Sequence, residues 1–155
     1  MKSTGLRIFV VLAFLALVSV PLASAQPQLS SVQSIYIADA YYADLDADGY
    51  EDDIKLLLEF SFENIEPLRV DLNIWIELPS GLMYTFRVSV WGAPAQSTLN
   101  IDCIDMATES GWYTVTMLAS VMGTGSGKVY ITDQLEFDPP TGSGPGLPPR
   151  VVAYF

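Results

Sequence analysis

The sequence predicts an all-β protein, an antiparallel β-sandwich of about seven strands. Apolar and polar side chains alternate with a period of two residues over most of the chain after residue 31, as expected for strands with one buried face. Clusters of glycine, proline and serine separate these runs, and no run has the helical period of 3.6 residues. Short, evenly spaced strands with frequent turns are typical of a two-sheet sandwich.

The alternation is clearest in the second run. Apolar residues stand at positions 54, 56, 58, 60 and 62, and only Leu57 interrupts the polar positions between them. The pattern repeats between 68 and 77, where Trp75 falls on the polar side. Turn residues at 79–81, 92–94, 109–111 and 123–127 bound the later runs. The predicted strands span residues 32–43, 54–62, 68–77, 84–91, 97–104, 112–121 and 128–137.

The first 25 residues have the pattern of a secretory signal peptide. Lys2 and Arg7 give a basic start, residues 8–20 form an apolar run without charge, and Ala23-Ser24-Ala25 supplies small residues before a cleavage site. An apolar run of about thirteen residues is too short to span a bilayer comfortably. We therefore expect an exported protein whose mature chain begins at Gln26 and contains no membrane span.

The mature chain, of about 130 residues, suits one domain. It holds all 18 acidic residues but only five of the seven basic ones, which gives a formal net charge of -13. Such a surface repels phosphate groups, so a nucleic-acid partner is excluded and cations or basic surfaces are favoured. Cys103 is the single cysteine and cannot form an internal disulfide; we expect an ordinary buried side chain.

A local motif narrows the sandwich further. The sequence Glu109-x-Gly111-x-Tyr113-x-Val115 resembles the acid-x-Gly-x-Tyr-x-Cys signature of immunoglobulin-like domains, in which the tyrosine hydroxyl bonds back to the backbone of the preceding corner. Here Glu replaces the usual Asp and Val replaces the Cys. The resemblance implies an immunoglobulin-like antiparallel β-sandwich without the inter-sheet disulfide, and it covers seven residues.

The most unusual stretch, DLDADGYEDD at 44–53, lies between the first two predicted strands and places six acidic residues within ten. Calcium takes six to eight oxygen ligands, which a loop supplies by presenting alternate carboxylates inward and turning sharply at a glycine. Acidic residues occupy loop positions one, three, five and nine, with Gly49 at position six. The spacing predicts one Ca²⁺ bound by Asp44, Asp46, Asp48, Asp52 and the backbone carbonyl of Tyr50.

The loop resembles the calcium loops of integrin-type FG-GAP repeats, Asp-x-Asp-x-Asp-Gly-x-x-Asp followed by an apolar strand. It departs from an EF-hand at position twelve, where Lys55 replaces the bidentate Glu, and no flanking helices are predicted. In FG-GAP repeats the loop joins two strands, so the resemblance implies the same ligand set here. It covers eleven residues in a single copy, so it does not imply a β-propeller. Together with the sandwich, it suggests a secreted surface protein of prokaryotic type.

The alternative is a solvated acidic turn without an ion. A turn needs only one Asp and one Gly, whereas each close pair of carboxylates costs roughly a kcal/mol even with good screening. We therefore favour calcium. Glu51 and Asp53 lie off the liganding positions and are expected to face water or to raise the local field.

Catalysis has little support in the sequence. The chain contains no histidine, which excludes histidine-based triads and the common zinc sites within it. Asp102 and Asp105 resemble a carboxylate pair for glycoside hydrolysis, but a polar strand exit accounts for them equally well. The tryptophans raise a different alternative, a platform for stacking carbohydrate: Trp75, Trp91 and Trp112.

The end of the chain combines a proline- and glycine-rich linker, residues 139–149, with a short β-prone segment, residues 150–155. This segment could return to its own sandwich, be donated to a neighbouring molecule, or form a tail that docks elsewhere or is disordered. We therefore expect a non-enzymatic, calcium-stabilised module, residues 26–138, for adhesion or extracellular structure. The alternatives are a filament subunit assembled by strand donation and a carbohydrate-binding module.

Overall fold

The computed structural model describes residues 33–63, 67–123, 128–137 and 147–155. The predicted signal peptide, the mature start at Gln26 and most of the linker lie outside these residues. In the part that is described, all regular structure is β-strand, and none of it forms a helix long and apolar enough to cross a membrane.

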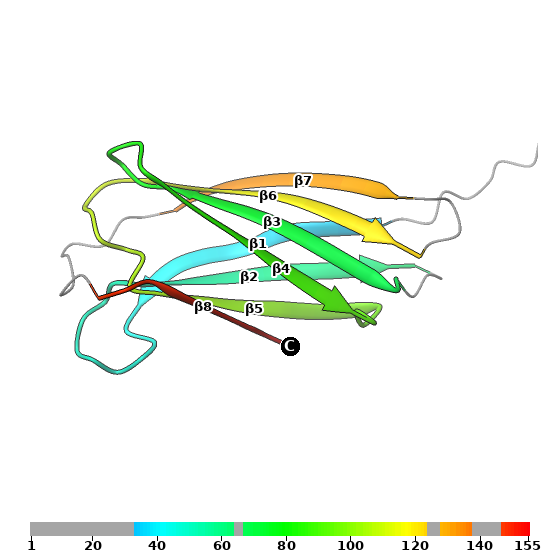
Figure 1. Cartoon of the computed structure of the whole chain (residues 1–155), viewed down its shortest axis with the longest axis horizontal. Helices are drawn as coiled ribbons and strands as arrows, with labels where there is room; N and C mark the ends of the chain where they lie inside the picture. The colour runs from blue at the N-terminus through cyan, green and yellow to red at the C-terminus, as the bar shows by residue number, and fades with distance from the viewer. Residues whose placement is uncertain (1–32, 64–66, 124–127, 138–146) are drawn as a thin grey trace, which may run out of the picture.

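Eight antiparallel strands form two sheets of four, which confirms the predicted β-sandwich (Figure 1). One sheet has the order β1-β2-β5-β8 and the other β4-β3-β6-β7. The seven predicted strands are all present and begin or end within two residues of the predicted bounds. The strands are β1 (Gln33–Ala43), β2 (Asp53–Phe62), β3 (Arg69–Glu77), β4 (Met83–Trp91), β5 (Gln96–Ile104), β6 (Tyr113–Met122), β7 (Val129–Phe137) and β8 (Arg150–Tyr154).

The core lies between the facing sheets and is built from the alternating apolar positions. In β2 and β3 the predicted inward residues are buried, among them Leu56 and Ile74, which are 0% exposed, but Leu68, predicted to face inward, precedes β3 and is 70% exposed. Leu57, which breaks the pattern, lies on the outer face and is only partly buried. Cys103 is a free, fully buried thiol within this core, as predicted.

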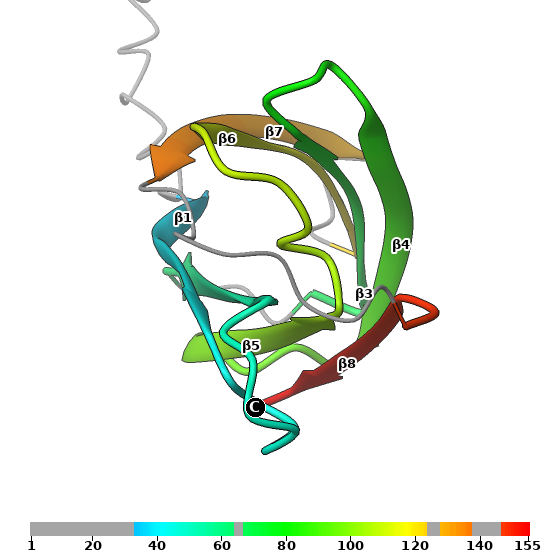
Figure 2. The same ribbon diagram turned by 90° about the vertical axis from the view of Figure 1, so that its left-hand side faces the viewer.

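The sheets meet along one side of the sandwich, where β1 runs beside β7 (Figure 2). A bulge at Ala38 shifts the register of β1 against β2 between Ile37 and Asp39. The Ile37 N–H donates to Asp133 Oδ2 at 2.7 Å, so a side chain of β7 binds the backbone of β1 across the two sheets.

The tyrosine corner predicted from the sequence is present. The Tyr113 hydroxyl donates to the Glu109 carbonyl and accepts from the Glu109 N–H, both at 2.8 Å. The Glu109 carboxylate in turn accepts hydrogen bonds from the N–H and the hydroxyl of Ser80, so it joins the β3–β4 turn to the β5–β6 connection. The immunoglobulin-like assignment itself stays a prediction.

The terminal segment pairs with its own domain. β8 lies antiparallel to β5, with Cys103 opposite Val151 and Asn100 opposite Tyr154. Of the three arrangements considered for residues 150–155, this single chain adopts the first. The β1–β2 loop, the β5–β6 connection and the start of β8 lie at the same end of the sandwich, on the left in Figure 1.

Candidate metal site at the β1–β2 loop

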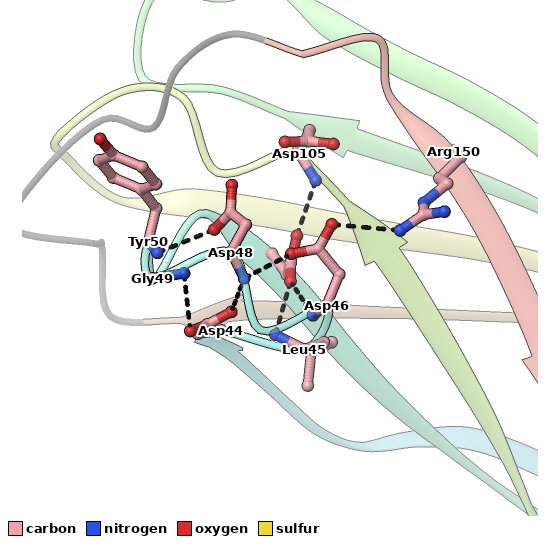
Figure 3. Close-up of polar contacts among 9 residues, drawn as sticks. Asp44, Leu45, Asp46, Asp48, Gly49, Tyr50, Asp105 and Arg150 are labelled. Carbon is pink, nitrogen blue, oxygen red and sulfur yellow. Dashed lines mark hydrogen bonds and ion pairs between the residues drawn. The ribbon is translucent and has the colours of Figure 1, made fainter.

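Residues 44–52 form a tight loop between β1 and β2 whose backbone is held by its own carboxylates. Asp44 accepts hydrogen bonds from the Asp48 and Gly49 N–H groups, each at 3.1 Å, and Asp48 accepts one from the Tyr50 N–H at 2.9 Å (Figure 3). Gly49 has a φ of 94°, a conformation that glycine adopts without strain. The sharp turn predicted at this glycine is therefore confirmed.

Two groups of carboxylates near the loop could hold a metal ion. The first is Asp44, Asp46 and Asp48, and the second is Asp48, Asp52 and Asp105; within each group one oxygen of every residue lies within 4.8 Å of the others. Two ligands of one Ca²⁺ at about 2.3–2.6 Å are separated by at most about 5 Å, so this spacing fits a shared ion. The four predicted carboxylates are thus divided between two groups that meet at Asp48.

Asp52 is the carboxylate whose environment is least expected without an ion. Its side chain belongs to a residue that is 1% exposed, and neither carboxylate oxygen has a hydrogen-bond partner among the residues that the structure describes. Burial raises the pKa of the Asp52 carboxyl, and the nearby charges of Asp48 and Asp105 raise it further. Buried polar atoms are almost always satisfied in native proteins, and two orphaned oxygens on one side chain therefore indicate an absent partner.

Of the two roles predicted for Asp53, facing water is wrong, whereas raising the local field agrees with its contribution to the raised pKa of the Asp52 and Asp105 carboxyls. Asp53 is 0% exposed. Its Oδ2 accepts the Leu45 and Asp46 N–H groups at 2.6 and 3.2 Å, and its Oδ1 accepts the Asp105 N–H at 2.8 Å. Asp53 therefore links the backbone of the acidic loop to the backbone of the residue after β5. Glu51 is exposed, in agreement with the prediction.

Asp105 is the residue that sequence reasoning missed as part of this site. Because β2 and β5 are antiparallel neighbours, with Ile54 opposite Cys103, the start of β2 and the end of β5 lie together. Asp105 is 5% exposed and has a φ of 57°. Burial raises the pKa of its carboxyl, with further contributions from neighbouring acids and an opposing one from Arg150. In the sequence, Asp105 is only an acidic residue at the end of a strand. It points to the site only once the pairing of β2 with β5 is known.

Two basic residues border the acidic cluster. Arg150, the first residue of β8, places Nη2 3.1 Å from Asp46 Oδ2 (Figure 3). Lys55, at position twelve of the loop, turns to the outer face of the sheet instead, where Nζ lies 2.6 Å from both Asp102 Oδ1 and the Tyr154 hydroxyl. Lys55 therefore does not occupy the place of the EF-hand Glu. The assignment of the Tyr50 carbonyl as a ligand stays a prediction.

Two pairs of residues considered for other functions, Asp102 with Asp105 and Trp75 with Trp91, are not brought together. Asp102 pairs with Lys55, whereas Asp105 faces the acidic cluster. In the second sheet, Trp91 lies opposite Arg69 while Trp75 lies six residues further along β3, opposite Thr85. At about 3.3 Å per residue this separation is about 20 Å, too far for one sugar ring to stack on both.

Comparison of the chain with protein-family models, with curated proteins and with solved structures gave no match.

Proposed function

We propose that this protein is a non-enzymatic, secreted or cell-surface β-sandwich module that binds calcium at the β1–β2 loop and is stabilised by it. The ligands would be Asp44, Asp46, Asp48, the Tyr50 carbonyl and Asp52. The signal-like N-terminus supports export, and the acidic surface supports a role among cations or basic partners outside the cell. Adhesion or extracellular structure is the role that fits these features.

The observation that carries the proposal is the Asp52 carboxylate. It is buried, it has no hydrogen-bond partner among the described residues, and it lies against Asp48 in a group of oxygens of metal-binding spacing. A buried carboxylate with no partner costs several kcal/mol if it is charged. A bound cation removes this cost by supplying the missing partner.

The chemistry of the donors favours calcium. Both carboxylate groups offer only oxygen ligands, which suit hard cations, and a site built from several protein carboxylates suits Ca²⁺ better than Mg²⁺, which usually keeps several waters. Extracellular modules bind calcium with dissociation constants of about 0.1 to 1 mM. Calcium concentrations above this range would keep the site of an exported domain largely filled.

The bound ion would act structurally, in place of a disulfide that a single cysteine cannot make. At ten to a hundred times the dissociation constant, binding to the folded form alone adds about 1 to 3 kcal/mol to the free energy of unfolding. For a domain of this size that corresponds to a rise in melting temperature of several degrees.

Calorimetry on the mature protein tests the proposal. We expect the melting temperature in calcium to exceed that in chelator by several degrees, and Asp48→Asn to lose most of this difference because Asp48 belongs to both carboxylate groups. Glu51→Gln is the matched control, since Glu51 is an exposed acid of the same loop outside both groups. Superimposable melting curves in calcium and chelator would refute calcium binding.

Assembly by strand donation remains a second candidate. It is supported by the five-residue β8, which lies at the edge of its sheet and pairs only with β5 among the described strands. The same pairing between two chains would join them without a new interface.

A further inference from the structure

The calcium loop lacks an acidic ligand at its twelfth position, and the fold brings a carboxylate to the same cluster from elsewhere. Lys55 stands at that position and is engaged by Asp102 on the outer face of the sheet. Asp105, which follows β5, is instead grouped with Asp48 and Asp52. We propose that Asp105 is a calcium ligand, so that one ion is bound jointly by the β1–β2 loop and the β5–β6 connection; this inference rests on the proposed function.

The Asp52 carboxylate, which has no hydrogen-bond partner within the described part of the chain, is the independent observation that points to an ion between these segments. Asp52 and Asp105 are 1% and 5% exposed, and their carboxylates lie in the same group. Water has little direct access to either residue, so solvent screens the two charges from one another only in part. A divalent cation is the partner that satisfies both carboxylates at once.

The position of Asp105 does not depend on the ion. Its N–H donates to Asp53 Oδ1 at 2.8 Å, and two residues later the Ala107 N–H donates to the Asp52 carbonyl at 2.7 Å. The connection is fixed again at Glu109 by the Tyr113 hydroxyl. Asp105 is therefore held at the cluster by backbone hydrogen bonds, which makes it a preorganised ligand.

The backbone at Asp105 also suits a short carboxylate. Its φ of 57° lies in the left-handed region, which residues other than glycine rarely adopt and in which Asn and Asp are enriched. Asn at this position therefore keeps the backbone and the side-chain volume while removing the charge. Asp105→Asn is for this reason a variant that tests ligation with little risk to folding.

Titration calorimetry with CaCl₂ on the full mature chain provides the test. We expect Asp105→Asn to weaken calcium binding by at least about tenfold, because the affinity of such sites follows the number of charged ligands. Asp102→Asn is the matched control: Asp102 lies three residues earlier and its carboxylate is bound to Lys55. The control should bind calcium with the affinity of the wild type.

Thermal melts separate ligation from a structural role. In chelator, Asp105→Asn should melt at or above the wild-type temperature because it removes a charge from a crowded cluster, and in calcium it should melt below the wild type. A structural residue would lower the melting temperature in both conditions. Wild-type affinity in Asp105→Asn overturns this inference and leaves the proposed function intact. A wild-type protein that binds no calcium overturns the proposed function, and this inference with it.

Discussion

Tyr113 shows how a single polar atom fixes the path of the chain at the end of the sandwich. The ring is 0% exposed and packs against Phe137, with ring centroids 5.5 Å apart. Its hydroxyl uses both its donor and an acceptor site on the backbone of Glu109. The buried phenol is thus satisfied entirely by the corner that it shapes.

Tyr113→Phe should lower the free energy of unfolding by about 1–3 kcal/mol, because the ring remains packed while the hydrogen bonds to Glu109 are lost. Denaturant titration measures the difference. Tyr36→Phe, at a tyrosine that is 47% exposed, serves as the control and should change stability by less than about 0.5 kcal/mol. Equal effects of the two substitutions would show that the corner hydrogen bonds contribute no net stability.

The neighbours Asp52 and Asp53 show that burial alone does not distinguish a structural carboxylate from a candidate ligand. Asp53 accepts three backbone N–H groups and is complete without an ion. Asp52, one residue earlier, receives no hydrogen bond at either oxygen from the described residues. The partners of each oxygen, and not its position in an acidic stretch, distinguish the structural carboxylate from the candidate ligand.

Among the elements, β3 and β4 are joined on their outer face by a charged network centred on Asp71. Its carboxylate accepts hydrogen bonds from Arg69 at 2.8 Å and from the Ser89 hydroxyl at 2.6 Å, and Arg87 Nη2 lies 2.7 Å from the second oxygen. Arg69 also stacks on Trp91, 4.7 Å from the ring centroid. Burial would raise the pKa of Asp71, but these hydrogen bonds outweigh it and hold the pKa below its ordinary value.

A lowered pKa in the folded state means that the stabilisation by Asp71 is present above about pH 4, the ordinary carboxyl pKa, and is lost as the pH falls through the lowered value. We expect Asp71→Asn to be less stable than the wild type by about 1–3 kcal/mol at pH 7. Because Arg87 is half exposed, solvent screens its contribution to this stabilisation. Denaturant titrations from pH 7 to pH 2 should show the difference shrinking toward zero, and a pH-independent difference would contradict the role assigned to the charge.

Most of the strands could be predicted because the alternation of apolar and polar residues within a strand shows which of its side chains are buried. Alternation in β2 and β3 marks which side chains face the core, whatever strand lies beside them. The bulge in β1 could not be predicted, since one extra residue at Ala38 depends on pairing with β2. The partner of β8 was equally open, because five residues of weak alternation fit more than one sheet edge.

Only the part of the candidate site that lies within a single loop could be predicted from the sequence. The spacing of Asp44, Asp46 and Asp48 indicated a group that the structure brings together. Asp105 joins the cluster across more than fifty positions, through the pairing of β2 with β5. The hydrogen bond from the Asp105 N–H to the Asp53 carboxylate depends on the same pairing. The pairing of β2 with β5 determines the position of Asp105 and its hydrogen bond to Asp53, and no periodicity in the sequence indicates which strands pair.

In the whole molecule, three segments that are far apart in the sequence meet at one acidic end of the sandwich. The β1–β2 loop contributes the carboxylates, the β5–β6 connection contributes Asp105, and β8 contributes Arg150, which contacts Asp46. β8 is also tied to the sheet by Lys55, which binds the Tyr154 hydroxyl, and by Phe155, whose ring lies edge-on to Phe60 with centroids 5.8 Å apart. The last strand is thus a part of the domain and not an appendage to it.

Deleting residues 150–155 should therefore destabilise the monomer. The deletion removes the β5–β8 hydrogen bonds and the Tyr154 partner of a buried lysine, at a cost of about 1–3 kcal/mol, or a fall of about 3–12 °C in melting temperature. It also uncovers the edge of β5, so the shortened protein should associate more readily than the full chain. Light scattering and thermal melts at matched concentrations in calcium measure both effects. If the full-length protein instead forms oligomers that the deletion abolishes, β8 is exchanged between molecules, and the strand-donation assembly replaces the self-contained sandwich.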